Sequence, residues 1–295
     1  MKHFRSPLVI KSFAKVNLYL QVLNKRKDNF HNLKTLFARI SLADTVILKN
    51  AEGKAIGIKC DNPQVPQNKT NLCWRAAELL RRSQGLSFGL KIEIKKRIPV
   101  GAGLGGGSAN AASVLSGLNK YWNLNLSKTK LLNLAAQLGS DIPFFIQDTK
   151  FALGSSRGDK IKPVASLQRL KLWFILIYPN IKVSTPLVYE KFDSFSGLTT
   201  PLANVKILIS ELSRKGFRVP PEYLFNSLEP VTTRLYPVVN QVKNAFYGIG
   251  LEQVMMSGSG AAVFALCSSQ KQAQGLSRKL RKKHKSWQIF VTSLA

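Results

Sequence analysis

A glycine-rich stretch at residues 97–112 has the composition of an anion-binding loop. It reads Arg-Ile-Pro-Val-Gly-Ala-Gly-Leu-Gly-Gly-Gly-Ser-Ala-Asn-Ala-Ala. The five glycines remove most side chains from the loop, so successive backbone N–H groups can approach an anion closely. The alanine-rich segment that follows predicts a helix whose N-terminal N–H groups and dipole point at the same anion. The stretch therefore predicts a phosphate-binding loop between a strand and a helix.

Three other interpretations of this stretch are weaker. A flexible linker would have polar flanks, whereas residues 90–95 alternate like a strand and apolar residues at helical spacing follow the loop. The P-loop signature requires Lys and then Ser or Thr after its last glycine, but Gly107 is followed by Ser108 and Ala109. A dinucleotide-binding fold requires an acidic residue about twenty positions on, and none lies between Glu93 and Asp141.

Charged and amide side chains elsewhere could act on a phosphate held by this loop. Lys15 and Asn17 interrupt an apolar alternating pattern, although a solvent-facing position is the more common fate of a lysine. Asp141 precedes a short helical pattern with Pro143 in its first turn, so helix capping is the alternative role for this carboxylate.

The elements that must position these residues follow from periodicity and capping. In the first half, strands are expected at 8–14, 16–23, 33–42, 44–49, 55–60 and 90–95, and helices after Asn71, after Ser108, from Ser127 to Gly139 and after Asp141. In the second half, strands are expected at 172–178, 251–256, 261–267 and 287–292, and helices from Thr185, at 202–212, at 228–246 and over the basic segment 278–285. A second small glycine turn is expected at 257–260, and a domain boundary near residue 155 divides the chain into 1–155 and 156–295.

Composition limits the class of protein. The chain has 295 residues, 45% of them hydrophobic, and its longest apolar runs are strand-sized, which predicts a globular protein with no membrane partner. Three widely separated cysteines have neither disulfide-scaffold nor metal-ligand spacing, and the first residues lack a signal-peptide pattern, so a cytoplasmic location is expected. The net charge of +29 is spread along the chain. It favours a polyphosphate substrate and non-specific polyanion binding at low salt rather than a specific nucleic-acid partner.

Three motifs together resemble those of the GHMP small-molecule kinases. They are Lys15-Val-Asn17 with Asp28-Asn-Phe-His31, the glycine loop ending in Asn110, and Ser257-Gly-Ser-Gly260. The glycine triplet and the segment 138–145, Leu-Gly-Ser-Asp-Ile-Pro-Phe-Phe, resemble the branch of that family that phosphorylates 4-diphosphocytidyl-2-C-methyl-D-erythritol in isoprenoid precursor biosynthesis. This resemblance implies an α+β fold with an N-terminal ribosomal-protein-S5-like domain and a C-terminal ferredoxin-like domain.

The same resemblance implies roles for individual residues. Lys15 and Asp141 are the expected catalytic residues. Binding of the ATP phosphates is expected from Pro99, Val100, Gly101, Ala102, Gly103, Leu104, Gly105, Gly106, Gly107, Ser108 and Ala109. Binding of the cytidylyl substrate is expected from Asn17, Phe30, His31, Asn110, Thr185 and Tyr189, with His31 at the cytosine edge and Tyr189 stacked on the ring. A small-molecule substrate and a monomer or weak dimer are expected.

The chain departs from the family pattern at two places. Asn29 and Phe30 stand where the family usually has Gly and Tyr, which removes a hydroxyl, and Asn226-Ser227 stands where an Asn-Asp pair is usual. ATP chemistry implies Mg2+, but no acidic cluster is available to hold it, so the ion is expected on the phosphates with water and Ser108. No protein metal site is predicted.

Overall fold

The computed structural model describes residues 6–87, 89–194 and 200–295, which form two compact units interleaved along the chain. The first unit comprises the described part of residues 1–14 together with Ala43–Val100 and Gly105–Thr149. The second comprises Lys15–Leu42, Gly101–Leu104 and Lys150–Ala295. The division into 1–155 and 156–295 stays a prediction, because these compact units follow packing rather than a single cut in the sequence.

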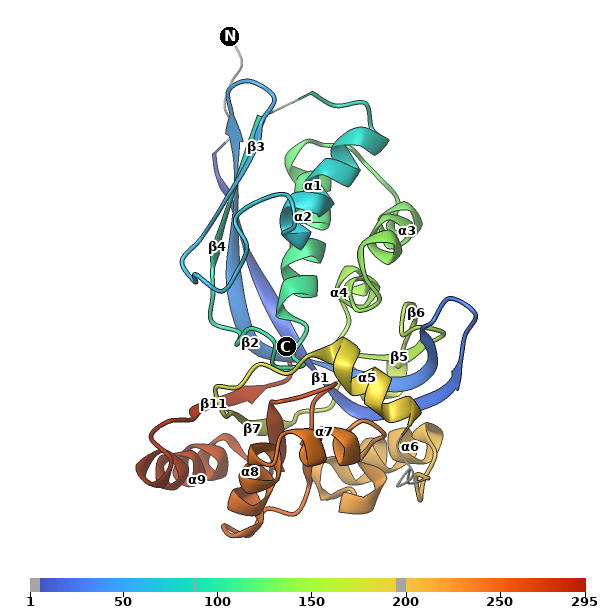
Figure 1. The fold of residues 1–295 in the computed structure, drawn as a ribbon, viewed down its shortest axis with the longest axis vertical. Coiled ribbons are helices and arrows are strands. Elements are labelled where there is room, and N and C mark those ends of the chain that lie inside the picture. The colour runs from blue at the N-terminus through green and yellow to red at the C-terminus, as the bar shows by residue number, and fades with distance from the viewer. Residues whose placement is uncertain (1–5, 88, 195–199) are drawn as a thin grey trace. The chain divides into compact units, whose positions relative to one another are not determined.

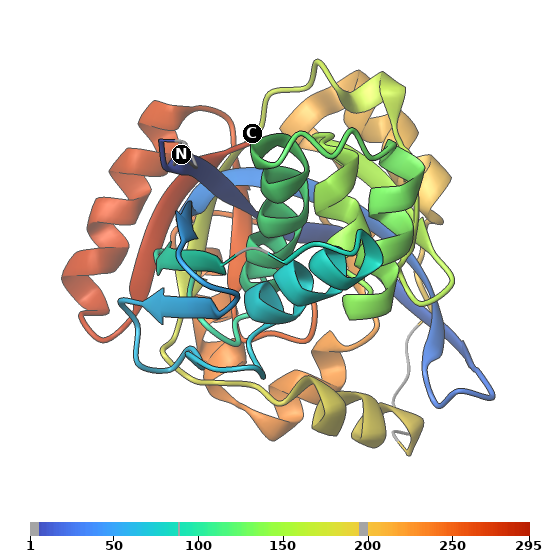
Figure 2. The same ribbon diagram turned by 90° about the horizontal axis from the view of Figure 1, so that it is seen from above.

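The first unit packs four helices on one face of a small sheet (Figures 1 and 2). Strand β4 (Gly89–Lys95) pairs in parallel with β3 (Ile56–Cys60) and antiparallel with Thr45–Ala51 of β2 (His31–Ala51), and β1 (Leu8–Lys25) follows β2. The helices are α1 (Leu72–Ser83), α2 (Gly106–Tyr121), α3 (Lys128–Leu138) and α4 (Ile142–Gln147). Asn71 and Ser127 cap α1 and α3 with their side chains, and Gly139 ends α3, as predicted.

Helix α2 is held unusually close to the sheet. A Cβ placed on Gly117 would lie 2.4 Å from Ile10 Cδ1 and 2.9 Å from Leu48 Cδ1, so the ends of these side chains would have to move to admit a larger residue. Val114 and Leu118 of the same helix are fully buried. Close packing of this helix fixes the position of its N-terminus, which is the end that follows the glycine loop.

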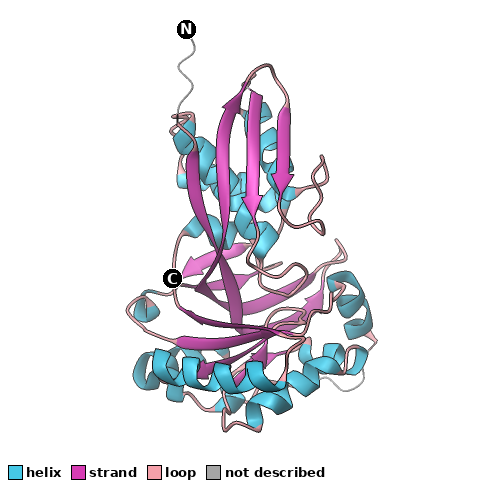
Figure 3. Ribbon diagram, turned by 90° about the vertical axis from the view of Figure 1, so that its left-hand side faces the viewer, coloured by secondary structure: helices cyan, strands magenta, loops and turns pink. Residues whose placement is uncertain are grey.

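The second unit contains a four-stranded antiparallel sheet (Figure 3). Its order is β11 (Gln288–Ser293), β7 (Trp173–Tyr178), β10 (Val263–Cys267) and β9 (Val254–Met256). Helices α8 (Val238–Tyr247) and α9 (Gln270–Lys283) contact these strands and complete a β-α-β-β-α-β unit, the ferredoxin-like arrangement. The remaining elements are β5 (Phe151–Ser155), β6 (Lys160–Pro163), β8 (Phe225–Asn226), α5 (Thr185–Asp193), α6 (Val205–Lys215), α7 (Glu229–Leu235) and short 3-10 turns at Ala165–Leu167, Gly216–Arg218 and Pro221–Tyr223.

Two predicted breaks in strands are absent, and one break between helices was not predicted. β1 and β2 are single long strands, whereas the sequence predicted interruptions at residues 14–17 and near 43. The polar residues there do not break the strands because they are buried and hydrogen-bonded: Lys15 donates to Asn17, and Asp44 accepts from backbone N–H groups. The helical stretch predicted at 228–246 is two helices, because Pro237 starts a new one after Tyr236.

Candidate functional site

The first part of the glycine loop, Gly101–Leu104, is anchored within the second unit by its backbone. Leu104 O accepts from Lys15 N at 3.0 Å, and Ala102 O accepts from Ala262 N at 3.1 Å. The side chains of Ala102 and Leu104 are buried, while Gly101 is exposed. The loop is therefore a fixed structure that presents glycine backbone to solvent, which supports the loop prediction over the linker alternative.

Gly103 is required at its position by both conformation and space. Its φ is +75°, and a Cβ would lie 2.0 Å from the backbone oxygen of Ser257. We expect Gly103→Ala to cost about 2 kcal/mol or more, because left-handed strain adds to the backbone clash. Chemical denaturation measures this change. The matched control is Gly275→Ala in α9, where a Cβ meets nothing within 4 Å; there the change should stabilise the helix by about 1 kcal/mol. Equal stability of the Gly103 variant and wild type would contradict the expectation.

The second part of the loop leads into α2 in the first unit. Gly105 is the N-cap residue with φ of 69°, and the first intrahelical bond of the cap runs from Ala109 N to Gly105 O. The N–H groups of Gly106, Gly107 and Ser108 precede that bond, so they have no carbonyl partner within the helix. They form the helix N-terminus at which the sequence predicts phosphate binding, and that role stays a prediction. Ser108 and Gly107 are accessible to solvent.

A buried carboxylate fixes the chain where β4 turns toward this loop. Asp44, which is fully buried, accepts hydrogen bonds from Arg97 N (2.7 Å) and Ile98 N (2.8 Å) and forms a close ion pair with Lys96. Asn110 donates to Asp44 Oδ2 and to Ser12 Oγ, each at 3.0 Å. Asn110 is 2% exposed, so its side chain links the loop to the sheet. Its predicted contact with substrate stays a prediction.

We expect Asp44→Ala to destabilise the first unit by about 3–5 kcal/mol, because it leaves the Lys96 ammonium buried without its partner. Two backbone N–H groups also lose their acceptor. Thermal and denaturant unfolding measure the effect. The matched control is Glu93→Ala, which breaks the half-exposed pair with Lys49 and should cost less than about 1 kcal/mol. A comparable loss of unfolding free energy in the two variants would show that the buried Asp44 network stabilises the protein no more than the half-exposed Lys49–Glu93 pair does.

Asp141 lies immediately before α4, at the N-cap position. Its side chain makes no capping hydrogen bond, in contrast to Asn71 and Ser127 at α1 and α3. Pro143 is in the first turn, as predicted, and Ile142 and Phe144 are buried in the first unit. The neighbouring side chains thus fix the backbone at Asp141 while the carboxylate is not used to cap the helix.

Lys15 begins a buried polar chain within the second unit. Its Nζ donates to Asn17 Oδ1 at 2.7 Å, Asn17 Nδ2 donates to Thr35 Oγ1 at 2.8 Å, and Thr35 Oγ1 donates to Tyr19 O at 2.7 Å. Lys15 is only 4% exposed, so the solvent-facing alternative is wrong. The bond to Asn17 orients the Lys15 ammonium within the second unit. The pairing of Lys15 with Asp141 stays a prediction, as does substrate contact by Asn17.

The second glycine turn, residues 257–260, lies against Lys15 and the glycine loop. Ser257 Oγ donates to Gly103 O at 3.1 Å, and a Cβ on Gly258 would lie 3.5 Å from Lys15 Nζ. Asn226 holds this turn by donating to Met256 O (2.9 Å) and Gly258 O (2.8 Å). Thr185 Oγ1 is 2.7 Å from Ser259 Oγ, which ties the start of α5 to the same turn. The departure at Asn226-Ser227 therefore falls on a segment that supports the turn.

His31 is enclosed by residues of α5. The ring of Tyr189 stacks on the imidazole with centroids 5.5 Å apart, and Phe192 meets its edge at 6.0 Å. Asp193 Oδ1 lies 2.6 Å from His31 Nε2. Phe30, predicted beside His31 in the substrate site, is half-exposed and lies 5.2 Å from the Arg157 guanidinium. Its contact with substrate stays a prediction. His31 and Tyr189 are thus in contact, while their binding of the cytidylyl substrate stays a prediction.

The comparisons with known proteins decide the family. GHMP kinases N terminal domain matches residues 71–148, and GHMP kinases C terminal matches residues 202–286. The chain is 38% identical to the 4-diphosphocytidyl-2-C-methyl-D-erythritol kinase of Enterococcus faecalis, over 88% of this chain and 90% of that protein. The chain belongs to the GHMP kinases. Like other members of this family, it is an ATP-dependent kinase of small molecules.

Further GHMP kinases agree in length and fold. The Acetivibrio thermocellus protein of the same name is 36% identical over 96% of this chain and 97% of its own. A crystal structure of 4-(cytidine 5'-diphospho)-2C-methyl-D-erythritol kinase superposes with a TM-score of 0.81 at 34% identity, covering 98% of this chain and 99% of that chain. A homoserine kinase from Cytophaga hutchinsonii, at 19% identity and a TM-score of 0.74, covers 100% of this chain and 96% of its own and shares the fold. The predicted GHMP kinase fold of class α+β is confirmed.

Sequence reasoning missed several residues around this GHMP kinase site. The sequence pattern indicates nothing for Asp44 beyond the start of a strand, and it indicates no role for Asn226. Asp193 and Arg157 were not singled out, although Asp193 is one of only 15 acidic residues in the chain. An acidic residue in so basic a protein is a signal that could have drawn attention to Asp193.

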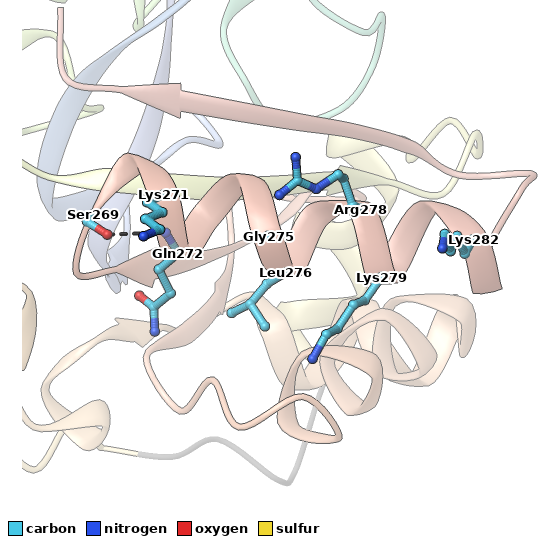
Figure 4. A pocket seen from close by; sticks show the side chains of 8 residues that line it. All are labelled: Ser269, Lys271, Gln272, Gly275, Leu276, Arg278, Lys279 and Lys282. Atoms are coloured by element: carbon cyan, nitrogen blue, oxygen red, sulfur yellow. Dashed lines mark hydrogen bonds between the residues drawn. The ribbon is translucent and has the colours of Figure 1, made fainter.

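A groove of about 710 Å³ lies along the solvent face of α9 (Figure 4). Its lining comes from that helix and its N-cap: Ser269, Lys271, Gln272, Gly275, Leu276, Arg278, Lys279 and Lys282. None of the predicted site residues is among them. The groove thus lies along the helix that the sequence predicts over the basic segment 278–285.

The described residues contain no group of three or more His, Cys, Asp or Glu that could hold a metal ion. In the same residues, no helix is both long and apolar enough to cross a membrane. The cytoplasmic location, the monomer or weak dimer and the absence of a specific nucleic-acid partner stay predictions.

Proposed function

We propose that this GHMP kinase transfers the γ-phosphoryl group of ATP to the 2-hydroxyl of 4-diphosphocytidyl-2-C-methyl-D-erythritol, a step of the methylerythritol phosphate route to isoprenoid precursors. The observation that carries this proposal is full-length similarity, at 34–38% identity, to kinases that bear that substrate's name. A homoserine kinase with the same fold is only 19% identical. The His31 and Tyr189 cluster supplies a ring-binding feature suited to a cytidylyl group.

In the proposed reaction, Asp141 accepts the proton of the acceptor hydroxyl. Phosphoryl transfer passes through a loose transition state, in which positioning and charge neutralisation contribute more than covalent chemistry by the protein. A carboxylate is a weak base, but it suffices when the hydroxyl proton leaves late in the reaction. The Asp141 side chain makes no capping hydrogen bond to α4.

The triphosphate is bound by the backbone of residues 101–108 and by the N-terminus of α2. N–H groups at this helix end and in the glycine loop stabilise the negative charge of the phosphate oxygens. Lys15, fixed by Asn17, neutralises charge that develops on the transferred group. The rigid anchoring of Gly101–Leu104 means that these donors do not have to reorganise during transfer.

Mg2+ is also part of the proposal. The described residues offer no cluster of carboxylates, which fits an ion held mainly by ATP phosphates and water, with the Ser108 hydroxyl as a protein ligand. When bound, Mg2+ neutralises phosphate charge.

The proposal is tested by an ADP-release assay with ATP, Mg2+ and three alternative acceptors: the cytidylyl compound, homoserine and mevalonate. We expect turnover with the cytidylyl compound alone. Faster turnover of homoserine or mevalonate would replace the proposed substrate, while absence of turnover with all three, in a protein that binds ATP, would reject this acceptor class.

A further inference from the structure

Three residues on one face of α5 hold the His31 ring in a defined orientation. Tyr189, Phe192 and Asp193 follow the i, i+3, i+4 spacing that places side chains on the same face of a helix. Tyr189 stacks on the ring with an interplanar angle of 29°, Phe192 meets it edge-on at 84°, and Asp193 binds Nε2. All of them belong to the second unit, where α5 lies beside the hairpin between β1 and β2 (Figure 1).

The contacts of Asp193 determine which nitrogen of His31 carries the proton. Lys25 Nζ donates to Asp193 Oδ2 at 2.5 Å, and this bond, together with the one from His31, holds the pKa of Asp193 below its usual range. An ionised carboxylate can only accept hydrogen bonds. His31 Nε2 must therefore be the donor, and in the neutral ring Nδ1 is left as an acceptor. Among the described residues, Nδ1 has no hydrogen-bond partner.

An acceptor at Nδ1 distinguishes two pyrimidine bases. Cytosine has an amino donor at position 4, whereas a uracil-type base has a carbonyl acceptor at that position. A base whose 4-amino group donates to Nδ1 lies near the plane of the imidazole, and the Tyr189 ring, which is close to parallel with that plane, can then stack on it. With a uracil-type base, the carbonyl oxygen at position 4 and His31 Nδ1 would both be acceptors. A buried polar group would then be left without a hydrogen-bond partner.

We propose that Asp193 is a positioning residue for base specificity: by accepting the Nε2 proton of His31, it presents Nδ1 to the 4-amino group of cytosine and disfavours uracil. This inference rests on the proposed function, because it takes the cytidylyl group of the substrate as the ligand of His31. It assigns Asp193 a role through His31 rather than a contact with the reacting atoms.

The first test does not depend on catalysis. The chain has three histidines, so long-range 1H–15N spectra can resolve His31 in the free protein. At pH 8, wild type should show His31 with the proton on Nε2 and none on Nδ1. Asp193→Ala and Asp193→Asn should both show a tautomer mixture, because alanine offers no acceptor and an asparagine amide can accept or donate. A proton on Nδ1 in wild type would overturn the inference.

The second test compares kcat/KM for the cytidylyl substrate with kcat/KM for its uridylyl counterpart. Asp193→Ala should lower the preference for cytidylyl by about 10- to 100-fold, leaving KM for ATP unchanged. The matched control is Glu190→Gln on the same helix, whose side chain is 68% exposed and pairs with Lys191; its preference should equal that of wild type. If wild type discriminates and Asp193→Ala discriminates equally, Asp193 has only a structural role. If wild type phosphorylates neither compound, the proposed function itself fails, whatever the tautomer.

Discussion

Replacing Asp141 by asparagine should lower kcat by about 10²- to 10⁴-fold, with binding of ATP retained. Asparagine has nearly the same size and shape as aspartate but cannot accept the hydroxyl proton. The neighbouring Ile142, Pro143 and Phe144 are buried, so the backbone at this position should not change. Steady-state kinetics and nucleotide binding by fluorescence or calorimetry measure the two quantities separately.

The matched control for this change is Asp148→Asn at the other end of α4. Asp148 is the C-cap residue, is exposed, and has φ of 51°, which asparagine adopts readily. This variant should retain wild-type kcat. An Asp141→Asn variant with unchanged kcat would remove that carboxylate from the mechanism.

Replacing Lys15 by methionine should lower kcat by about 10²- to 10³-fold, because one fixed positive charge is lost from the transition state. Its effect on stability should be small or favourable. Lys15 is buried, and an apolar side chain of similar length avoids the cost of burying an ammonium group. A variant that folds at least as stably as wild type but has lost activity would separate a catalytic role from a structural one.

Lys11→Met provides the matched control on the same strand, since Lys11 is exposed. It should change neither kcat nor the melting temperature. If Lys15→Met retained kcat, charge neutralisation would have to come from elsewhere in the protein. If it unfolded the protein, the chain from Lys15 through Asn17 to Thr35 would be required for folding, and Lys15→Arg, which keeps the charge, would then test the catalytic role.

Local sequence signals predicted the parts of the fold that depend on neighbouring residues. As expected, Asn71 caps the start of α1, Ser127 caps the start of α3 and Gly139 ends α3. The glycine loop joins β4 to α2. The sheet strands were placed correctly where alternation or a continuous apolar run was strong, as in β7. These features arise from backbone conformation and capping, which involve only residues close in sequence.

Long-range partners account for what could not be predicted. The sequence predicts a break at Lys15 because polar residues in strands usually face solvent. It predicts no partner for Asp44, which accepts hydrogen bonds from Arg97 N and Ile98 N, 53 and 54 residues away. The bond between His31 and Asp193 spans 162 residues, and no periodicity links its two ends. The roles of Lys15, Asp141 and His31 came from motif resemblance, and the structure added the contacts that orient Lys15 and His31.

The proposed reaction has one direct test. The full chain is incubated with 4-diphosphocytidyl-2-C-methyl-D-erythritol, ATP and Mg2+, and the products are followed by 31P NMR, with the Asp141→Asn variant as a parallel sample. We predict a new phosphomonoester signal coupled to carbon 2 of the erythritol, equal in amount to the ADP formed, with the cytidylyl diphosphate intact. ADP formation without that monoester, or a phosphomonoester on another hydroxyl, would contradict the proposed function.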